Sequence, residues 1–170
     1  AGEDSWSKVF LERPAGLPVT QATLADGFTI RPLAGTPEVP AYVEMHQRTF
    51  ESKNMQVGWR LRTLQHPHYR PDLDLVAVAP DGRLAAFCIG WLDGNDPSIG
   101  QIEPMGVHPD FRKYGLGWVV LAECMRRLQA HGVTRIVLET DLERNAALLV
   151  YKSSGFQIRR DVLVYRKDFE

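Results

Sequence analysis

The sequence predicts one α+β domain in which helices flank a mixed, mostly antiparallel central sheet. A length of 170 residues is typical of a single domain and is sufficient for a substantial core. Strand and helix patterns follow one another in the order strands, two helices, three strands, helix, strand, helix, strands. Turn signals mark a hairpin between consecutive strands. We expect residues 28–170 to form the domain, and residues 1–27 to supply an N-terminal strand and a linker.

The N-terminal third begins with strands and continues into two helices. Trp6 to Glu12 is predicted to be a short strand, and the proline- and glycine-punctuated stretch from Pro14 to Gly27 a linker. Phe28 to Leu33 is predicted to be the second strand. Apolar residues recur at the helical period over residues 39–50, and more weakly over residues 57–64. The first strand suggests pairing with a preceding unit or with the sheet of a partner.

A β-hairpin and a further strand follow. Leu73 to Ala79 and Leu84 to Leu92 are rich in strand-forming side chains and flank a Pro-Asp-Gly turn. Ile99 to Val107 is the next strand, but it contains Pro104 and Gly106, which an ordinary central strand tolerates poorly. We therefore expect a bulge, or a local separation from the neighbouring strand, at this point.

The C-terminal part alternates helices with strands. Gly115 to His131 carries the clearest amphipathic helical pattern. Arg135 to Thr140 contains a continuous apolar run, which indicates a strand buried on both faces. Residues 146–152 are predicted to form a short helix. The chain then closes with two strands, Phe156 to Arg159 and Val162 to Arg166.

Composition and charge argue against several classes of protein. The formal net charge is −1 and the sequence pI is about 6.6, which disfavour nucleic-acid binding. Cys88 and Cys124 form no Cys-x-x-Cys pair, so we expect two buried thiols, no metal site and a reducing compartment. No secretory signal pattern or run of membrane-spanning length is recognisable. The expectation is a cytoplasmic protein with no nucleic-acid or membrane partner, and a homodimer is left open.

The strongest functional signal is the strand–loop–helix unit from Ile99 to His131. Gly115 and Gly117 lie at the start of its helix, where backbone N–H groups can approach an anion without a Cβ in the way. The helix N-terminus adds unpaired donors and a partial positive charge. Arg112 and Lys113 add formal positive charge beside it. This combination indicates a phosphate-binding site.

Two common nucleotide-binding loops do not fit this segment. A Walker loop requires Gly-Lys-Ser/Thr, whereas Gly117 is followed by Trp118. A dinucleotide-binding loop requires a third glycine, and Val120 occupies that position. The phosphate site therefore belongs to another class of loop.

Two motifs resemble those of the GCN5-related N-acetyltransferase (GNAT) family. The first is Val107-His108-Pro109-Asp110-Phe111-Arg112-Lys113-Tyr114-Gly115-Leu116-Gly117, which is similar to the family pattern Val-x-Pro-x-x-Arg/Gln-x-x-Gly-x-Gly/Ala. The second is Tyr151-Lys152-Ser153-Ser154-Gly155-Phe156, which is similar to Tyr-x-x-x-Gly-Phe. The well-matched part runs from about Ile102 to Phe156. The resemblance implies a GNAT-like fold with splayed central strands and acetyl-coenzyme A (acetyl-CoA) as the cofactor.

The resemblance also implies where the cofactor lies. Its pyrophosphate would contact Arg112, Lys113, Tyr114, Gly115, Leu116 and Gly117. Its pantetheine arm would pair, like an added strand, with Met105, Gly106 and Val107, and the N–H near Val107 would polarise the thioester carbonyl. The family often has an asparagine where this chain has Arg144. Asn145, one residue later, either contacts the cofactor or caps its helix.

Proton transfer would fall to two side chains. Tyr151 is the candidate acid, since the tyrosine of this motif commonly points at the cofactor sulfur; its alternative role is core packing. Glu103 is the candidate base, because strand alternation places Glu103, Met105 and Val107 on one face. An ordinary surface or hydrogen-bonded glutamate is the alternative.

Other side chains remain alternatives for the acceptor site. His46, on the first predicted helix, and His68 are further candidates for the base, whereas His108 is more typical of a loop residue. Trp59 and Trp91 either line an acceptor pocket or pack in the core, and packing is the commoner role.

The activity that the resemblance implies is acetyl transfer from acetyl-CoA to a primary amine, by direct attack in a ternary complex. The amine is a small molecule, an aminosugar or a protein N-terminus, and no motif distinguishes among them. Two alternatives stay open. One is a unit of a tandem mycothiol synthase-like acetyltransferase, which the segment from Asp72 to Trp91 weakly resembles. The other is a non-catalytic acetyl-CoA-binding module.

Overall fold

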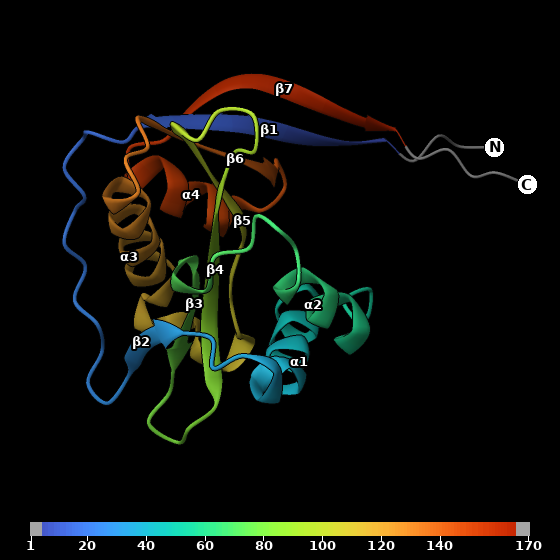
Figure 1. Cartoon of the computed structure of the whole chain (residues 1–170). Coiled ribbons are helices and arrows are strands. Elements are labelled where there is room, and N and C mark those ends of the chain that lie inside the picture. The colour runs from blue at the N-terminus through green and yellow to red at the C-terminus, as the bar shows by residue number, and fades with distance from the viewer. Residues whose placement is uncertain (1–4, 166–170) are drawn as a thin grey trace, which may run out of the picture.

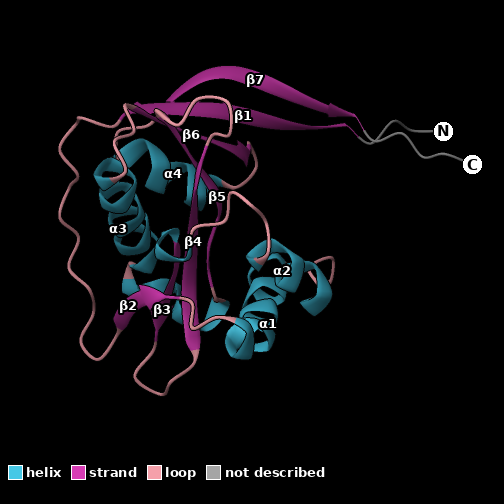
Figure 2. Ribbon diagram, in the orientation of Figure 1, coloured by secondary structure: helices cyan, strands magenta, loops and turns pink. Residues whose placement is uncertain are grey.

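The computed structural model describes residues 5–165, which form a seven-stranded sheet with helices on both faces (Figure 1, Figure 2). The strands are β1 (Ser5–Pro14), β2 (Thr29–Pro32), β3 (Asp74–Val78), β4 (Leu84–Leu92), β5 (Ile99–Val107), β6 (Arg135–Asp141) and β7 (Gln157–Tyr165). The helices are α1 (Val39–Phe50), α2 (Val57–Leu64), α3 (Leu116–Ala130) and α4 (Asn145–Ser153), with 3-10 turns η1 (Thr36–Glu38), η2 (Pro71–Leu73) and η3 (Pro109–Tyr114). Residues 1–4 of the predicted N-terminal segment, and residues 166–170 with the end of the last predicted strand, lie outside the described residues.

The sheet order is β2-β3-β4-β5-β6-β1-β7. Neighbouring strands are antiparallel except for β5 and β6, which are parallel. The prediction of a mixed, mostly antiparallel sheet is confirmed. Figure 1 shows α1 and α2 on one side of the sheet, and α3 with α4 on the other. Within residues 5–165, no helix combines the length and the apolar character needed to cross a membrane.

The two faces of the sheet pack against different helices, which gives two apolar clusters. Along β4, Ala86 and Cys88 belong to the cluster that contains α3, while Phe87 and Ile89 belong to the cluster that contains α1. This alternation follows the two-residue period of a strand. Burial on both faces explains why β4 is apolar along most of its length. Cys88 and Cys124 are buried free thiols, as predicted.

β5 and β6 pair over three residues and then separate. Their parallel register ends at Gln101 opposite Val137. On its other edge β5 stays paired with β4, apart from a bulge in which Glu103 and Pro104 lie opposite Ile89. The predicted bulge and the predicted separation of the central strands are both confirmed.

The N-terminal strand β1 lies inside the sheet, between β6 and β7, and is antiparallel to both. It therefore pairs with two strands of its own chain. β7 is one continuous strand rather than the two short strands predicted. Arg160 and Asp161 interrupt the apolar pattern of the sequence, but they lie on an edge strand, where charged side chains reach solvent.

Candidate active site

A cavity of about 390 Å³ lies beside the separated end of β5. Its walls come from the end of β5, the first turn of α3, the first turns of α4 and the C-terminal end of α1. Among the predicted cofactor contacts, the lining includes Met105, Gly106, Val107, Arg112, Gly115, Leu116, Gly117 and Asn145. The strand, loop and helix that the sequence singled out therefore converge on one cavity.

The backbone of β5 presents a donor to this cavity. Immediately after β5, the N–H of His108 donates to the carbonyl of Ala85 in β4 at 2.8 Å. Because successive peptide groups of a strand point to opposite edges, the N–H of Val107 points away from β4. The pairing of β5 with β6 ends at Gln101, so this N–H faces the open edge. A donor in this position can bind the carbonyl oxygen of a ligand.

The N-terminus of α3 provides a second set of donors. Gly115 precedes the helix with φ of 67°, a left-handed conformation that glycine adopts without strain. Among the described residues no side chain caps α3, so the N–H groups of its first turn are available to an anion. A Cβ on Gly117 would lie 3.7 Å from Val107 Cγ2, an ordinary contact. Packing therefore permits a Cβ at this position, and its absence leaves the cavity wall open there.

Of the residues predicted in the loop before α3, some line the cavity and others point away from it. Arg112 lines the cavity and donates to the carbonyls of Val107, from Nε at 3.3 Å, and Thr49, from Nη2 at 3.0 Å. Lys113 and Tyr114 are outside the described lining. The Tyr114 ring packs against the Phe28 ring at 4.9 Å between centroids, and Nζ of Lys113 lies 5.6 Å from the Tyr114 ring. The 3-10 turn η3 accounts for this division, because it points successive side chains in different directions.

The start of α4 forms the opposite wall of this first cavity. Asn145 is the first residue of α4, and among the described residues no side chain caps the helix. The alternative that Asn145 is a cap is therefore wrong, and Asn145 lines the cavity, where the predicted cofactor contact stays a prediction. Arg144 also lines the cavity, with its guanidinium carbon 4.7 Å from the centroid of the Phe50 ring. A cation held at this wall favours a negatively charged ligand.

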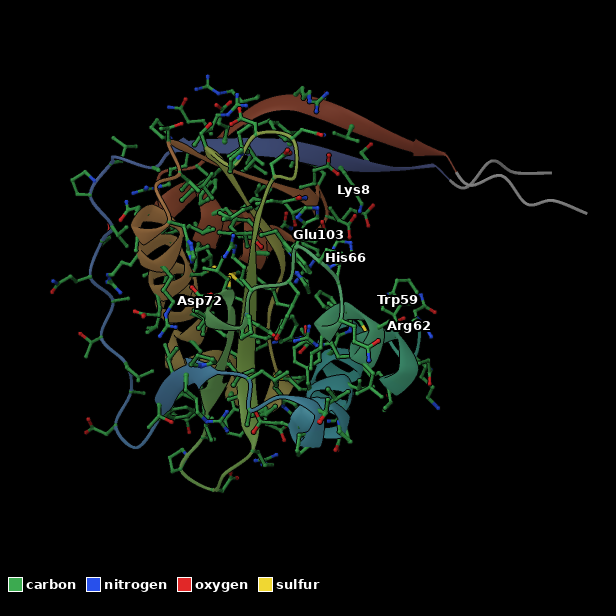
Figure 3. The ribbon with its side chains drawn as sticks, in the orientation of Figure 1. Lys8, Trp59, Arg62, His66, Asp72 and Glu103 are labelled. Carbon is green, nitrogen blue, oxygen red and sulfur yellow. The ribbon has the colours of Figure 1, made fainter. Side chains whose placement is uncertain are left out.

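A second cavity, of about 370 Å³, lies on the α1–α2 side of the sheet. Trp91 of β4 and Trp59 of α2 both line it, and Trp59 is 58% exposed, so the packing alternative is wrong for Trp59. Glu103 lines the same cavity; Gln101 Nε2 donates to its carboxylate at 3.1 Å, and Trp91 Nε1 donates to its carbonyl at 2.9 Å. Figure 3 shows Glu103 and Trp59 on the same side of the sheet. The cavity thus combines aromatic faces with a carboxylate.

The bulge in β5 changes the face that Glu103 occupies. Alternation predicted Glu103 on one face with Met105 and Val107. In the structure Met105 and Val107 line the first cavity, whereas Glu103 and Pro104 line the second. The extra residue of the bulge shifts the alternation by one position. The candidate base is therefore in a different cavity from the predicted cofactor contacts.

Tyr151, the candidate acid, lies on α4 beside Val150, which lines the first cavity. Tyr151 is 3% exposed. Burial raises the pKa of its hydroxyl, and the neighbouring Cys88 raises it further. A raised pKa keeps the hydroxyl protonated, which is the state that a proton donor requires. The structure does not bring Tyr151 and Glu103 into one cavity.

His46 lies on α1 and lines the second cavity. Its ring stacks on Phe87, with 5.6 Å between centroids and 24° between planes. Burial, and to a smaller extent the charge of Arg60, lowers the pKa of His46 to about 4. The imidazole is therefore neutral near pH 7 and is a weak base, which favours Glu103 over His46 as the acceptor of an ammonium proton.

The two other histidines that the sequence suggested have local roles or positions. His108 caps η3, where its Nδ1 accepts from the N–H of Asp110 at 3.1 Å. His68 is exposed, and neither cavity includes it. The loop assignment of His108 is therefore confirmed.

A buried ion pair that the sequence did not predict lies behind the second cavity, and its arginine, Arg60, lines that cavity. Arg60 of α2 is 1% exposed, and its Nη2 lies 2.5 Å from Oδ2 of Asp74, which is 0% exposed. The hydroxyl of Tyr69 donates to the same carboxylate oxygen. The guanidinium carbon of Arg60 lies 3.9 Å from the centroid of the Tyr42 ring. The signal in the sequence was a charge within an apolar pattern, at Asp74 between Leu73 and Leu75.

Known acetyltransferases match this chain in sequence. A profile of the acetyltransferase (GNAT) family matches residues 39–156, and the chain belongs to that family. A mycothiol acetyltransferase from Thermomonospora curvata is 30% identical over 142 residues, covering 82% of this chain and 47% of the relative. Another from Salinispora arenicola is 29% identical over 155 residues, covering 86% of this chain and 50% of the relative.

Solved structures agree on the architecture. A GCN5-related N-acetyltransferase from Sphaerobacter thermophilus superposes with a TM-score of 0.81 at 23% identity, covering 95% of this chain and 51% of that chain. At this identity the likeness shows the fold, and it confirms the predicted GNAT-like sheet. The chain spans about half the length of these relatives.

Proposed function

We propose that this chain is an acetyl-CoA-dependent N-acetyltransferase that acetylates a primary amine by direct attack. The observation that carries the proposal is the meeting of two donor sets in the first cavity: the N–H of Val107 on the open edge of β5, and the first turn of α3. A thioester on a pyrophosphate-bearing arm requires both, a donor for its carbonyl and a cradle for its phosphates. Membership of the acetyltransferase (GNAT) family supports acetyl-CoA as the ligand.

Three groups of the chain would handle the reaction, for which bound acetyl-CoA supplies the acetyl thioester. The Val107 N–H donates to the thioester carbonyl oxygen. Glu103 accepts the proton that the acceptor's ammonium group loses, directly or through water. The amine nitrogen would then form the new C–N bond as the C–S bond breaks, and the second proton that this nitrogen loses would pass to solvent. The Tyr151 hydroxyl donates its proton to the departing sulfur and regains one from solvent.

The second cavity supports a cationic amine as the acceptor. Glu103 supplies a carboxylate, and the faces of Trp59 and Trp91 attract an ammonium group. Arg60 contributes no uncompensated charge, because Asp74 pairs with it. A small primary amine that enters as the ammonium form fits this balance best.

A matched pair of variants tests cofactor binding. Gly115 has a left-handed φ, and a Cβ there would meet open space, so aspartate and asparagine are tolerable at this position. Gly115→Asp adds a negative charge at the cradle, whereas Gly115→Asn has the same shape without the charge. We expect saturating acetyl-CoA, at about 100 times its Kd, to stabilise the wild type by about 2.7 kcal/mol. Gly115→Asn should retain most of this effect and Gly115→Asp should lose it.

Thermal melting with and without acetyl-CoA measures binding, and detection of released thiol over a panel of amines measures turnover. A wild-type melting temperature that does not respond to millimolar acetyl-CoA would remove the cofactor assignment. Stabilisation without thiol release on any amine would favour the non-catalytic acetyl-CoA-binding module.

A second candidate is one unit of a tandem mycothiol synthase-like acetyltransferase. It is favoured by the two relatives named mycothiol acetyltransferase and by the chain's span of about half their length. Under this proposal the acceptor is an aminosugar-linked amine. The same panel distinguishes the candidates if it includes amino sugars beside simple primary amines: a preference of tenfold or more (about 1.4 kcal/mol) for amino sugars would favour the second.

A further inference from the structure

Thr49 and Phe87 fill the space beside Gly106, at one end of the first cavity. A Cβ on Gly106 would lie 2.6 Å from Thr49 Cγ2 and 2.7 Å from Phe87 Cζ. Carbon atoms in favourable contact are about 3.5–4.0 Å apart, so both distances are severe overlaps. β5 carries a glycine here because side chains from α1 and β4 already occupy the position of a Cβ.

The methyl group of Thr49 is held in place from two sides. The Thr49 hydroxyl donates to the carbonyl of Met45 at 2.8 Å, which leaves Cγ2 to face Gly106. The Thr49 carbonyl accepts a hydrogen bond from Arg112 Nη2 at 3.0 Å, which connects the end of α1 to η3. Thr49 is buried and lines the first cavity. Its methyl group is therefore a fixed part of that lining.

Phe87 supports this methyl group from within the sheet. Its side chain is fully buried, and its ring packs against Tyr42 at 5.4 Å, His46 at 5.6 Å and Phe50 at 5.9 Å between centroids. Three surrounding rings leave it little freedom to move aside, since protein interiors are close-packed.

The contact lies where the two cavities approach each other. Thr49 and Gly106 line the first cavity, while His46, one helical turn before Thr49, and Pro104, two residues before Gly106, line the second. An acyl group that passes from a ligand in the first cavity to an amine in the second must cross this boundary. The carbonyl end of such a group would then lie beside Gly106 and the Thr49 methyl group.

We propose that the Thr49 methyl group, supported by Phe87, limits the length of the transferred acyl chain to two carbons. This inference rests on the proposed acetyl-CoA-dependent function. A propionyl or butyryl chain needs room for one or two more carbons, and the space beside Gly106 is taken by Thr49 Cγ2 and the Phe87 ring. The bonds formed and broken are the same for each acyl group, so the residues select by volume alone.

Two substitutions at Thr49 isolate the methyl group. Thr49→Ser keeps the hydroxyl that bonds to Met45 but lacks Cγ2, whereas Thr49→Val keeps a methyl group and lacks the hydroxyl. The experiment measures kcat/KM for acetyl-, propionyl- and butyryl-CoA with one amine. We expect the propionyl-to-acetyl ratio to rise about tenfold in Thr49→Ser, because one methylene in an apolar pocket changes discrimination by about that factor. The ratio should stay near the wild-type value in Thr49→Val.

A second pair of variants tests whether Phe87 holds the Thr49 methyl group in place. Phe87→Leu should raise the use of butyryl-CoA relative to acetyl-CoA, while Phe28→Leu, a buried change in the other apolar cluster, should leave the ratio unchanged. Thermal shifts with the three thioesters give the same comparison without an amine. Unchanged ratios in Thr49→Ser and Phe87→Leu, with normal acetyl transfer by the wild type, would overturn this inference and leave the proposed function standing. Absence of binding and turnover with every thioester would overturn both.

Discussion

Replacing Arg60 by methionine removes the positive charge that is paired with the buried Asp74 carboxylate. The two side chains are 1% and 0% exposed, and Nη2 lies 2.5 Å from Oδ2. Methionine retains most of the packing on the Tyr42 ring but, within residues 5–165, leaves the carboxylate with the Tyr69 hydroxyl as its remaining side-chain hydrogen bond. Breaking a buried pair from one side costs about 3–5 kcal/mol. For a chain of this size each kcal/mol lowers the melting temperature by about 2–4 °C, so a fall of roughly 6–20 °C is expected.

Urea unfolding followed by circular dichroism measures this loss, and a double-mutant cycle assigns it to the pair. Asp74→Asn should cost a similar amount, because it leaves the guanidinium buried without its counter-charge. The double variant Arg60→Met/Asp74→Asn should be more stable than the sum of the two single losses implies, because neither charge is then left unpaired. Arg83→Gln is the control: its ion pairs with Asp81 and Asp110 are about half exposed, and exposed pairs contribute little to stability because solvent screens them. Additive single losses, or a loss for Arg60→Met as small as that of the control, would refute the reasoning.

Three further predictions concern the candidate chemistry. Tyr151→Phe should lower turnover about a hundredfold while changing the acetyl-CoA melting shift little, because it removes a proton donor and retains the ring; full turnover would end the acid assignment. Glu103→Gln should lower turnover near pH 7, and part of the turnover should return as the pH rises and the amine substrate loses its proton in solution. Acetyl-CoA should still bind this variant, because Glu103 lines the other cavity. Loss of acetyl-CoA binding would contradict the separation of the two cavities. The pKa of His46 is lowered from 6.5 to about 4 in the folded chain, so between these values the unfolded chain binds a proton that the folded chain does not, and stability falls as the pH drops through this window. His46→Gln should flatten that loss in urea unfolding at pH 7, 5.5 and 4, and an equally steep loss would show that other groups cause it.

Features that depend on consecutive residues were predictable. Gly115 and Gly117 place backbone donors at the start of a helix, and their role depends on the local conformation of the loop. Pro104 and Gly106 predicted the bulge and the separation of β5 from β6, because a missing N–H and a missing Cβ disturb a ladder wherever they occur. The same bulge made the predicted face of Glu103 wrong, because one extra residue in a strand reverses which side chains share a face beyond it.

Features that depend on distant residues were not predictable. Thr49 lies far in sequence from Gly106 and Arg112, and nothing in its own helical pattern separates it from other residues near the end of α1. Tyr114 matches the family signature, but a 3-10 turn points its ring at Phe28, outside the cavity. Trp59 satisfies a helical apolar pattern and is nevertheless 58% exposed, because α2 presents that side of the helix to the second cavity.

The fold class and the uncapped backbone donors at the start of α3 were predictable from the sequence alone, because both follow from short-range chain chemistry: the hydrophobic period, the glycine conformation and the free N–H groups of a helix start. Only the three-dimensional packing shows that Glu103 lines one cavity while Met105 and Val107 line another. It also shows that Thr49 belongs to the wall of the first cavity, and that Arg60, paired with the buried Asp74, belongs to the wall of the second. The physical reason is that a side chain's contacts are set by which elements the sheet order and the bulge bring together, and that information is spread over the whole chain.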